Sequence, residues 1–421
     1  MKHIDCIRSL AAAVAIGATT GWGGEIAILP SESILDGPEG RQHLLVVGKE
    51  GDLFAGEIEG VKITSSNPDI ITIAESEIGL PVAVPKKNGT VTITAKSPAG
   101  ETATAKIEVK NFEKEHNWSF TNHVLPVLSR QGCNTGGCHG AIAGKGGFRL
   151  SLNGYDPPGD FYTMTREMRG RRIEMADPAR SLILTKPTQA TPHKGGRRLD
   201  ATSRDYRVLA EWVTNGAAPP SDEEPEVEQI EVLPAESLLK PGQSQRLVVL
   251  AHYSDGSVED VTTWARFTAT DETAASVDEA GTVSVIGHGQ GAVVAWFSSK
   301  IVLARITSPY PNEIPDSIFT DAPKANFIDE TVLAQLRQLN LKPSPRTADE
   351  QFVRRVFIDT IGKLPTVEET RKFIEDTDPG KRTKLVDDLL GREEFVDYWA
   401  YRFSDILLVN GKTLRPGQVK A

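Results

Sequence analysis

The stretch Leu29-Pro-Ser-Glu-Ser-Ile-Leu35 recurs almost unchanged as Leu233-Pro-Ala-Glu-Ser-Leu-Leu239. A Gly/Pro turn follows each copy, and a run of branched apolar residues comes next, at 44–47 and at 247–250. Short apolar runs that are separated by turn residues are typical of strands in a β-sandwich. The repeat therefore predicts two all-β sandwiches of similar size within one chain.

We place the two sandwiches at residues 25–112 and 229–312. The second copy contains Tyr253-Ser-Asp-Gly-Ser257 followed by Asp260-Val-Thr-Thr-Trp264, and on these residues it resembles the group 2 bacterial Ig-like domain. That resemblance implies spacer or adhesive modules on an exported protein. Neither copy contains a set of residues that indicates catalysis.

The residues between the copies, 113–220, follow a helical pattern. A first helix is predicted at 120–130, with Pro126 either inside it or at its true start. A second is predicted at 203–215, where apolar residues share one face at helical spacing, namely Tyr206, Leu209, Trp212 and Val213. An acidic linker at 221–228 separates this mostly α domain from the second sandwich.

The first of these helices leads into Cys133-Asn-Thr-Gly-Gly-Cys138-His139. Two thiols followed directly by an imidazole indicate a covalent haem c site, in which the cysteines hold the porphyrin and His139 binds the iron. The usual spacing has two residues between the cysteines, whereas this chain has four. Two alternatives stay open on the spacing alone: a Cys133–Cys138 disulfide, and a metal site that adds a further histidine.

The wider segment resembles the planctomycete-type cytochrome c domain. The matching stretches are 129–140, 144–152, 154–156, 169–172, 176–182, 186–188, 192–196 and 212–217. The resemblance implies one covalent haem c and places the distal iron ligand between 176–182 and the last helix. The imidazole in that window is His193, so we expect His139 and His193 to be the two axial ligands. Other sulfur or imidazole side chains of the region are His116, His123, Met164, Met168 and Met175.

A helical domain is predicted at 317–421. Its helices are expected at 329–339, 348–361, 366–374, 381–390 and 394–408. The stretches 352–365, 381–390 and 398–403 resemble the start of the domain of unknown function, family 1549, that accompanies such cytochromes. The resemblance implies that the segment is the N-terminal part of a larger domain.

The N-terminal residues 1–24 resemble an export signal, because Lys2 and Arg8 precede a short apolar core at 10–18. Removal of this signal would also remove Cys6. No other run is long enough to span a bilayer. The net charge of −10 argues against nucleic acid as a partner.

These observations predict an exported multidomain protein of the periplasm or cell surface that carries single electrons on one haem c. Its partner would be a redox protein or an attached domain, with envelope components or surface polysaccharide as further partners. No enzymatic reaction or catalytic residue is assigned. The alternatives are a haem-free envelope or adhesion protein with a Cys133–Cys138 disulfide, and the spacer region of a hydrolase that acts on polysaccharide.

Overall fold

The computed structural model describes residues 24–51 and 53–409 of the 421-residue chain. The chain divides into two compact units, with the boundary between Leu341 and Lys342. The predicted export signal, Cys6 included, lies outside the described residues except for Gly24. Among the helices that the structure describes, none is both long and apolar enough to cross a membrane.

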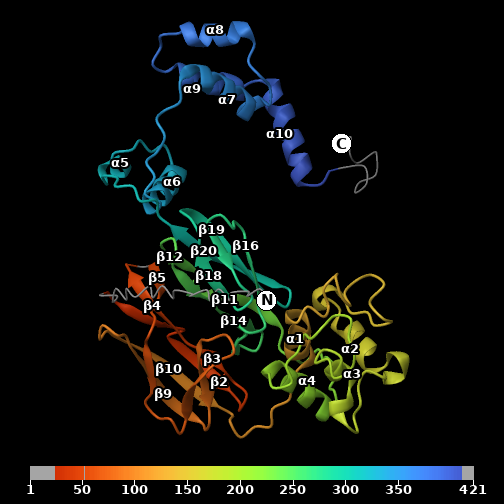
Figure 1. Ribbon diagram of the computed structural model, residues 1–421. Coiled ribbons are helices and arrows are strands. Elements are labelled where there is room, and N and C mark those ends of the chain that lie inside the picture. The colour runs from red at the N-terminus through yellow and green to blue at the C-terminus, as the bar shows by residue number, and fades with distance from the viewer. Residues whose placement is uncertain (1–23, 52, 410–421) are drawn as a thin grey trace, which may run out of the picture. The chain divides into compact units, whose positions relative to one another are not determined.

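The first copy of the repeat is an all-β sandwich (Figure 1). Its described strands are β1 (Ile26–Leu29), β2 (Glu32–Asp36), β3 (Gln42–His43), β4 (Leu45–Glu50), β5 (Leu53–Glu57), β6 (Lys62–Ser65), β7 (Ile71–Glu75), β8 (Pro81–Pro85), β9 (Gly89–Lys96) and β10 (Thr102–Lys110). Successive side chains of a strand point to opposite faces. Val91, Ile93 and Ala95 of β9 are therefore buried together in the core, while the threonines between them face outward.

The second copy repeats this plan strand for strand. Its described strands are β11 (Val227–Leu233), β12 (Glu236–Leu238), β13 (Ser244–Arg246), β14 (Val248–Tyr253), β15 (Val258–Asp260), β16 (Arg266–Ala269), β17 (Ala275–Val277), β18 (Thr282–Val285), β19 (Gly289–Phe297) and β20 (Lys300–Ser308). Antiparallel pairing of β1 with β4 recurs as β11 with β14, and parallel pairing of β2 with β10 recurs as β12 with β20. The predicted internal repeat is thus confirmed.

The two sandwiches are joined through one continuous sheet. A seven-stranded sheet runs in the order β1-β4-β5-β12-β20-β19-β16, and β5 meets β12 where Phe54 pairs with Ser237. Arg246 adds an ion pair across this junction, with its Nε 3.0 Å from a Glu57 carboxylate oxygen. A small apolar cluster is also shared by the copies, consisting of Leu45, Val47, Leu80, Val248 and Leu250.

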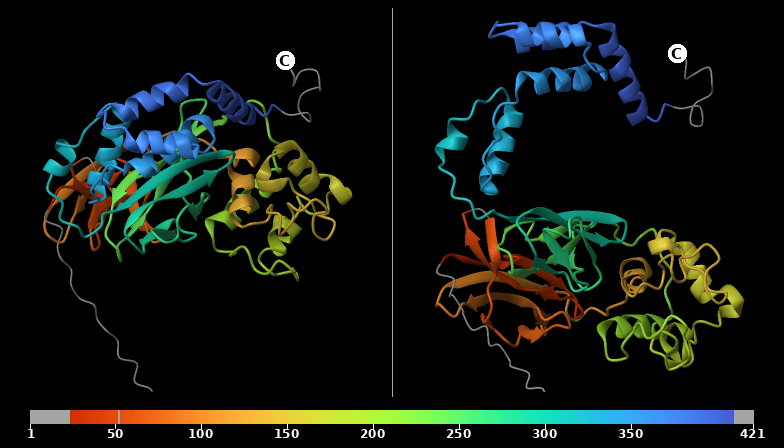
Figure 2. Two further views of the ribbon diagram at one scale, coloured as in Figure 1. Left: turned by 90° about the horizontal axis from the view of Figure 1, so that it is seen from above. Right: turned by 45° about the horizontal axis from the view of Figure 1, so that its top comes forward.

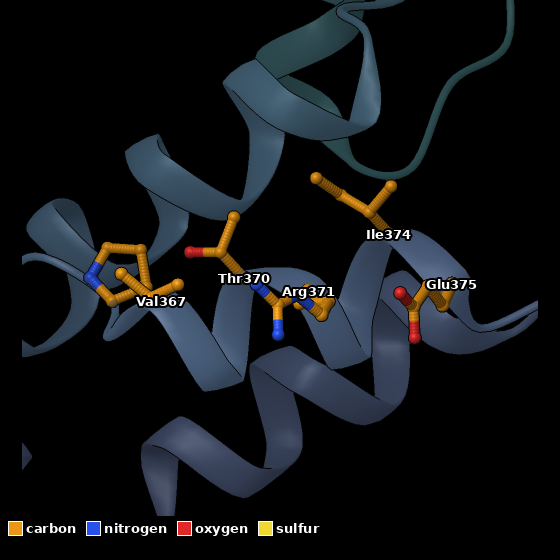
Figure 3. Close-up of a pocket in the computed structure, with 6 residues that line it drawn as sticks. Val367, Thr370, Arg371, Ile374 and Glu375 are labelled. Atoms are coloured by element: carbon orange, nitrogen blue, oxygen red, sulfur yellow. The ribbon is translucent and has the colours of Figure 1, made fainter.

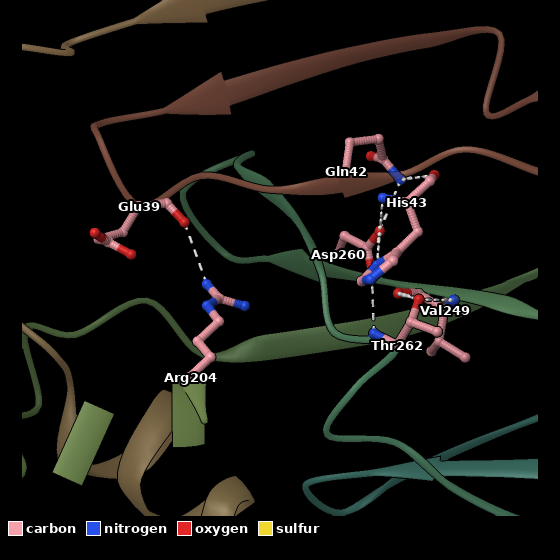
Figure 4. A network of polar contacts seen from close by, with 7 residues as sticks. All are labelled: Glu39, Gln42, His43, Arg204, Val249, Asp260 and Thr262. Carbon is pink, nitrogen blue, oxygen red and sulfur yellow. Dashed lines mark hydrogen bonds and ion pairs between the residues drawn. The ribbon is translucent and has the colours of Figure 1, made fainter. Parts of the chain in front are cut away.

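A buried carboxylate adds a polar contact between the sandwiches (Figure 4). Asp260 Oδ2 accepts hydrogen bonds from the His43 backbone N–H at 2.6 Å, from His43 Nδ1 at 3.0 Å and from Gln42 Nε2 at 2.9 Å. Its Oδ1 accepts from the Thr262 N–H at 3.0 Å. Burial by itself raises the pKa of a carboxyl group, but the charge and hydrogen bonds of His43 outweigh it. The pKa of Asp260 therefore lies below its usual value.

The region between the sandwiches is helical and consists of short elements linked by loops (Figure 2). These are η1 (Phe120–Val124), α1 (Leu125–Arg130), η2 (Leu152–Gly154), α2 (Pro157–Thr165), η3 (Glu167–Gly170), η4 (Pro178–Arg180), α3 (Leu182–Thr185) and α4 (Arg204–Thr214). The predicted helix at 120–130 is a π-helical turn followed by α1. Pro126 lies in the first turn of α1, which continues directly from the π-helical turn.

The predicted helix at 203–215 is confirmed as α4. Ser203 caps it by accepting a hydrogen bond from the Tyr206 N–H at 3.2 Å. Trp212 on its inner face is buried against Phe120, with ring centres 5.4 Å apart. This core is continuous with that of the second sandwich, where Trp264 Nε1 donates to Asp205 of α4 at 3.0 Å.

The C-terminal unit contains α7 (Asp349–Ile361), α8 (Val367–Glu375), α9 (Lys381–Leu390) and α10 (Glu393–Ile406). Val353, Phe357 and Ile361 lie one above the other on α7 and form its core with Phe373 and Leu389. Helical periodicity therefore located these helices correctly.

The two preceding helices, α5 (Ser317–Thr320) and α6 (Phe327–Gln338), belong to the first unit. The Tyr310 N–H donates to the Leu339 carbonyl at 3.0 Å, and Gln335 donates to Gln290 of β19 at 2.7 Å. The compact C-terminal unit begins at Lys342, and the helical domain predicted from residue 317 includes these two preceding helices as well.

Candidate functional site

The motif loop, residues 133–139, follows α1 and turns back on itself. The His139 N–H donates to the Cys133 carbonyl at 2.9 Å, so the wide spacing between the cysteines closes into a compact loop. A Cβ atom on Gly140 would lie 2.1 Å from the Asn134 carbonyl oxygen. Glycine is therefore required directly after the histidine, because it alone lets the backbone approach so closely.

The two cysteines of the loop are free thiols. Both are half-buried, and Cys133 packs against the apolar core. Burial, with a smaller contribution from Cys138, raises the pKa of the Cys133 thiol to about 12. The thiolate is the form that exchanges disulfides. Cys133 therefore stays a protonated thiol at neutral pH.

His139 is held in one orientation by the backbone. Its Nδ1 lies 3.0 Å from the Phe148 carbonyl oxygen, and its ring contacts the Phe148 ring with centres 4.6 Å apart. A carbonyl oxygen only accepts hydrogen bonds, so Nδ1 carries the proton and Nε2 keeps its lone pair. Burial lowers the pKa of His139, which favours the neutral imidazole that metal binding requires.

His193 is anchored in the same way and lies next to His139. Its Nδ1 is 3.0 Å from the Gly196 carbonyl oxygen. The two imidazole rings are almost parallel, at 10°, with their centres 6.3 Å apart. In both rings the hydrogen bond to the backbone is made by Nδ1. The fold thus brings together two histidines that are far apart in sequence.

The separation of the two ring centres, 6.3 Å, equals that of two imidazoles bound to one iron. Metal–imidazole bonds are about 2 Å long, which puts the centres of two such rings roughly 6 Å apart. Within the described ranges, no three His, Cys, Asp or Glu side chains converge in a way that could hold a metal ion. A haem needs only two such ligands from the protein, because the porphyrin supplies the remaining four.

The other side chains considered as distal ligands are positioned differently. His123 Nε2 lies 3.3 Å from Glu259 of the second sandwich, and His116 packs edge-on against Trp118. Met164 is fully buried in the core, whereas Met168 and Met175 are exposed. Of the histidines, the structure places His193 beside His139.

Large apolar side chains are exposed along the segment that follows the motif loop. They are Ile142, Leu152, Tyr155, Tyr162, Met168 and Met175, with exposed fractions from 48% to 90%. Apolar surface of this kind is typical of sites that receive an apolar ligand or partner. These exposed side chains belong to the same helical region of the chain as the two histidines.

A hollow lies in the C-terminal unit, on one face of α8 (Figure 3). It measures about 380 Å³ and is lined by Pro365, Val367, Thr370, Arg371, Ile374 and Glu375. It contains no histidine or cysteine, and it shares no residue with the motif loop.

Comparison with known families matches two parts of the chain. Residues 226–297 match the bacterial Ig-like domain (group 2), and residues 327–416 match a protein of unknown function, DUF1549, also called PSCyt2. Both agree with the resemblances seen in the sequence. The chain is therefore a multidomain protein with a bacterial Ig-like module and a helical DUF1549 region. No curated protein matches it.

Solved structures of tandem β-sandwich proteins align with this chain at low similarity. Domains 4 and 5 of the S-layer protein SbsC share 11% identity, with a TM-score of 0.18 over 68% of this chain and 96% of that one. Domains 5–6 of the same protein share 12% identity, with a TM-score of 0.26 over 68% and 97%. Tandem Ig repeats of Dlar share 7% identity, with a TM-score of 0.17 over 68% and 98%. Scores this low do not establish a common overall fold.

Sequence reasoning named the four side chains of the site but missed the groups that orient them. The carbonyl groups of Phe148 and Gly196 carry no residue-specific signal, because every residue has a carbonyl. Gly140 did have a signal, since it follows the motif directly, whereas Gly136 and Gly137 lie within the motif. In the structure these two are exposed.

Proposed function

We propose that residues 113–220 form a c-type cytochrome domain, with haem bound covalently at Cys133 and Cys138 and axially by His139 and His193. The observation that carries the proposal is the pair of near-parallel imidazoles, each anchored at Nδ1 by a backbone carbonyl. The haem iron would supply one-electron redox chemistry. The protein is then an electron carrier rather than an enzyme in the residues present.

The remaining parts of the chain support a role outside the cytoplasm. Export would bring the chain to the compartment in which haem c is attached, and the Ig-like modules would act as spacers or adhesive units. We propose the periplasm or the cell surface as its location. Its partner would be a redox protein or an attached domain, and envelope components or surface polysaccharide would contact the sandwiches.

Expression with the natural N-terminus in a bacterial host that matures c-type cytochromes tests the haem. We expect denatured protein to retain haem-linked peroxidase staining, a pyridine haemochrome band, and a haem mass increment on the peptide with Cys133 and Cys138. The Cys133→Ser/Cys138→Ser variant is the matched control and should lose all three signals. A folded but colourless wild-type protein without the mass increment would refute the proposal.

The distal ligand is tested by His193→Ala. Losing one of two strong-field imidazoles should convert the low-spin spectrum to a high-spin or mixed one, while the haem stays covalently bound. His252→Ala is the control, because His252 pairs with Glu231 in the second sandwich and should leave the spectrum unchanged. An unaltered low-spin spectrum in His193→Ala would assign the distal position to another side chain.

A further inference from the structure

Arg172 is a buried cation that contacts Phe148, the residue to which the proposed proximal ligand His139 is hydrogen-bonded. It is 6% exposed, although the adjacent Arg171 is exposed. A buried guanidinium needs several acceptors to offset its lost hydration. The acceptors that surround Arg172 therefore indicate its structural role.

The guanidinium of Arg172 ties three segments together. Nη2 donates to the Gly147 carbonyl at 2.6 Å and lies 3.0 Å from a Glu167 carboxylate oxygen. Nη1 donates to the Thr163 carbonyl of α2 at 2.7 Å. The guanidinium carbon also lies over the Phe148 ring, 4.6 Å from its centre. Gly147 and Phe148 are thereby fixed against α2.

Phe148 is the residue whose carbonyl oxygen accepts the hydrogen bond from His139 Nδ1. The same oxygen also accepts from the Lys145 N–H at 2.9 Å, in a tight turn. A carbonyl in a glycine-rich turn holds a fixed direction only if the turn itself is held. In this turn, Arg172 donates a hydrogen bond to the Gly147 carbonyl and lies over the Phe148 ring.

We infer that Arg172 is a positioning residue for His139: it holds the Phe148 carbonyl that keeps the imidazole in the tautomer with Nε2 free. The inference rests on the proposed role of His139 as an axial ligand. The hydrogen bond to Gly147 and the contact with the Phe148 ring connect Arg172 to His139 through the 147–148 segment. A lysine at this position would keep the charge but could not bond both carbonyls and stack on the ring.

The test reads the tautomer of His139 in the haem-free full chain, by NMR of histidine-labelled protein made without haem maturation. Wild-type His139 should carry its proton on Nδ1. In Arg172→Met, the loss of one net hydrogen bond should shift the tautomer ratio roughly two- to tenfold towards the Nε2-protonated form. Arg172→Lys should shift it in the same direction, and Arg171→Met, which removes the exposed neighbouring charge, should not.

The same variants are then made with haem. Arg172→Met should show a broadened or split low-spin EPR signal, because the proximal imidazole is less well ordered. The inference is wrong if wild-type His139 is protonated on Nε2. It is also wrong if a folded Arg172 variant has an unchanged tautomer ratio, and neither outcome depends on the haem result. If instead the NMR result is as expected but the wild-type chain gains no haem mass, the proposed function fails while the contact network stands.

Discussion

Replacing Asp260 by alanine tests how the two sandwiches are joined. The Asp260 side chain is completely buried and accepts hydrogen bonds from Gln42, His43 and Thr262. Two of these residues come from the first sandwich and one from the second. Alanine would leave three sets of buried donors without an acceptor, at the point where the two sandwiches meet.

The magnitude follows from these contacts. A buried donor that loses its acceptor costs about 1–3 kcal/mol, and the Asp260 carboxylate accepts from four donors. Water that enters the space left by the carboxylate would satisfy some of the donors. We therefore expect Asp260→Ala to lower the free energy of unfolding by about 3–5 kcal/mol.

Urea unfolding at pH 7, followed by tryptophan fluorescence, measures this loss. Asp271→Asn in the same sandwich is the matched control: Asp271 is exposed and bonds the Thr273 N–H at 2.9 Å, a contact that asparagine keeps. The control should stay within about 0.5 kcal/mol of wild type. An Asp260→Ala effect no larger than that of the control would refute the reasoning.

The same contacts predict a pH dependence. The folded-state pKa of Asp260 is lowered, so its stabilisation is fully present above the unfolded value of about 3.9. It is lost as the pH falls through the lower folded value. The stability difference between wild type and Asp260→Ala should therefore shrink in strong acid. A difference that stayed constant from pH 7 to pH 2 would show that the carboxylate charge is not responsible.

Three further variants test individual contacts. Trp212→Ala should lower the free energy of unfolding by about 3–5 kcal/mol in the urea assay, because this indole is 1% exposed and fills the core; a loss below 1 kcal/mol would contradict that packing. Gly362→Ala should destabilise the C-terminal unit by about 1–3 kcal/mol in thermal melts followed by circular dichroism. Its φ is 71°, and a Cβ atom would lie 2.3 Å from the Tyr398 ring, so an unchanged melting curve would be inconsistent with the structure. Thr366→Ala should cost about 1 kcal/mol, because the Thr366 hydroxyl caps α8 by accepting from the Glu369 N–H, whereas Thr366→Ser should be nearly neutral.

Much of the local structure could be predicted from the sequence. The near-identical stretches at Leu29 and Leu233 indicated two sandwiches of one plan, because strand alternation and turn residues act over a few neighbours. Helices such as α4 and α7 followed from apolar spacing. The thiols and the imidazole of the motif are adjacent in the chain, so their proximity was also evident. A proline at the start of α1 was foreseen, but not the π-helical turn before it.

The tertiary structure decided how these parts combine. The sequence by itself determined two repeated sandwiches, a helical region with a Cys/Cys/His motif, and a helical C-terminal segment. It did not determine that one sheet crosses both sandwiches, that Asp260 meets His43, or that His193 lies beside His139. The physical reason is that periodicity and capping depend on residues within a few positions. The meeting of distant side chains, and the backbone carbonyls that orient them, depend on how whole surfaces pack.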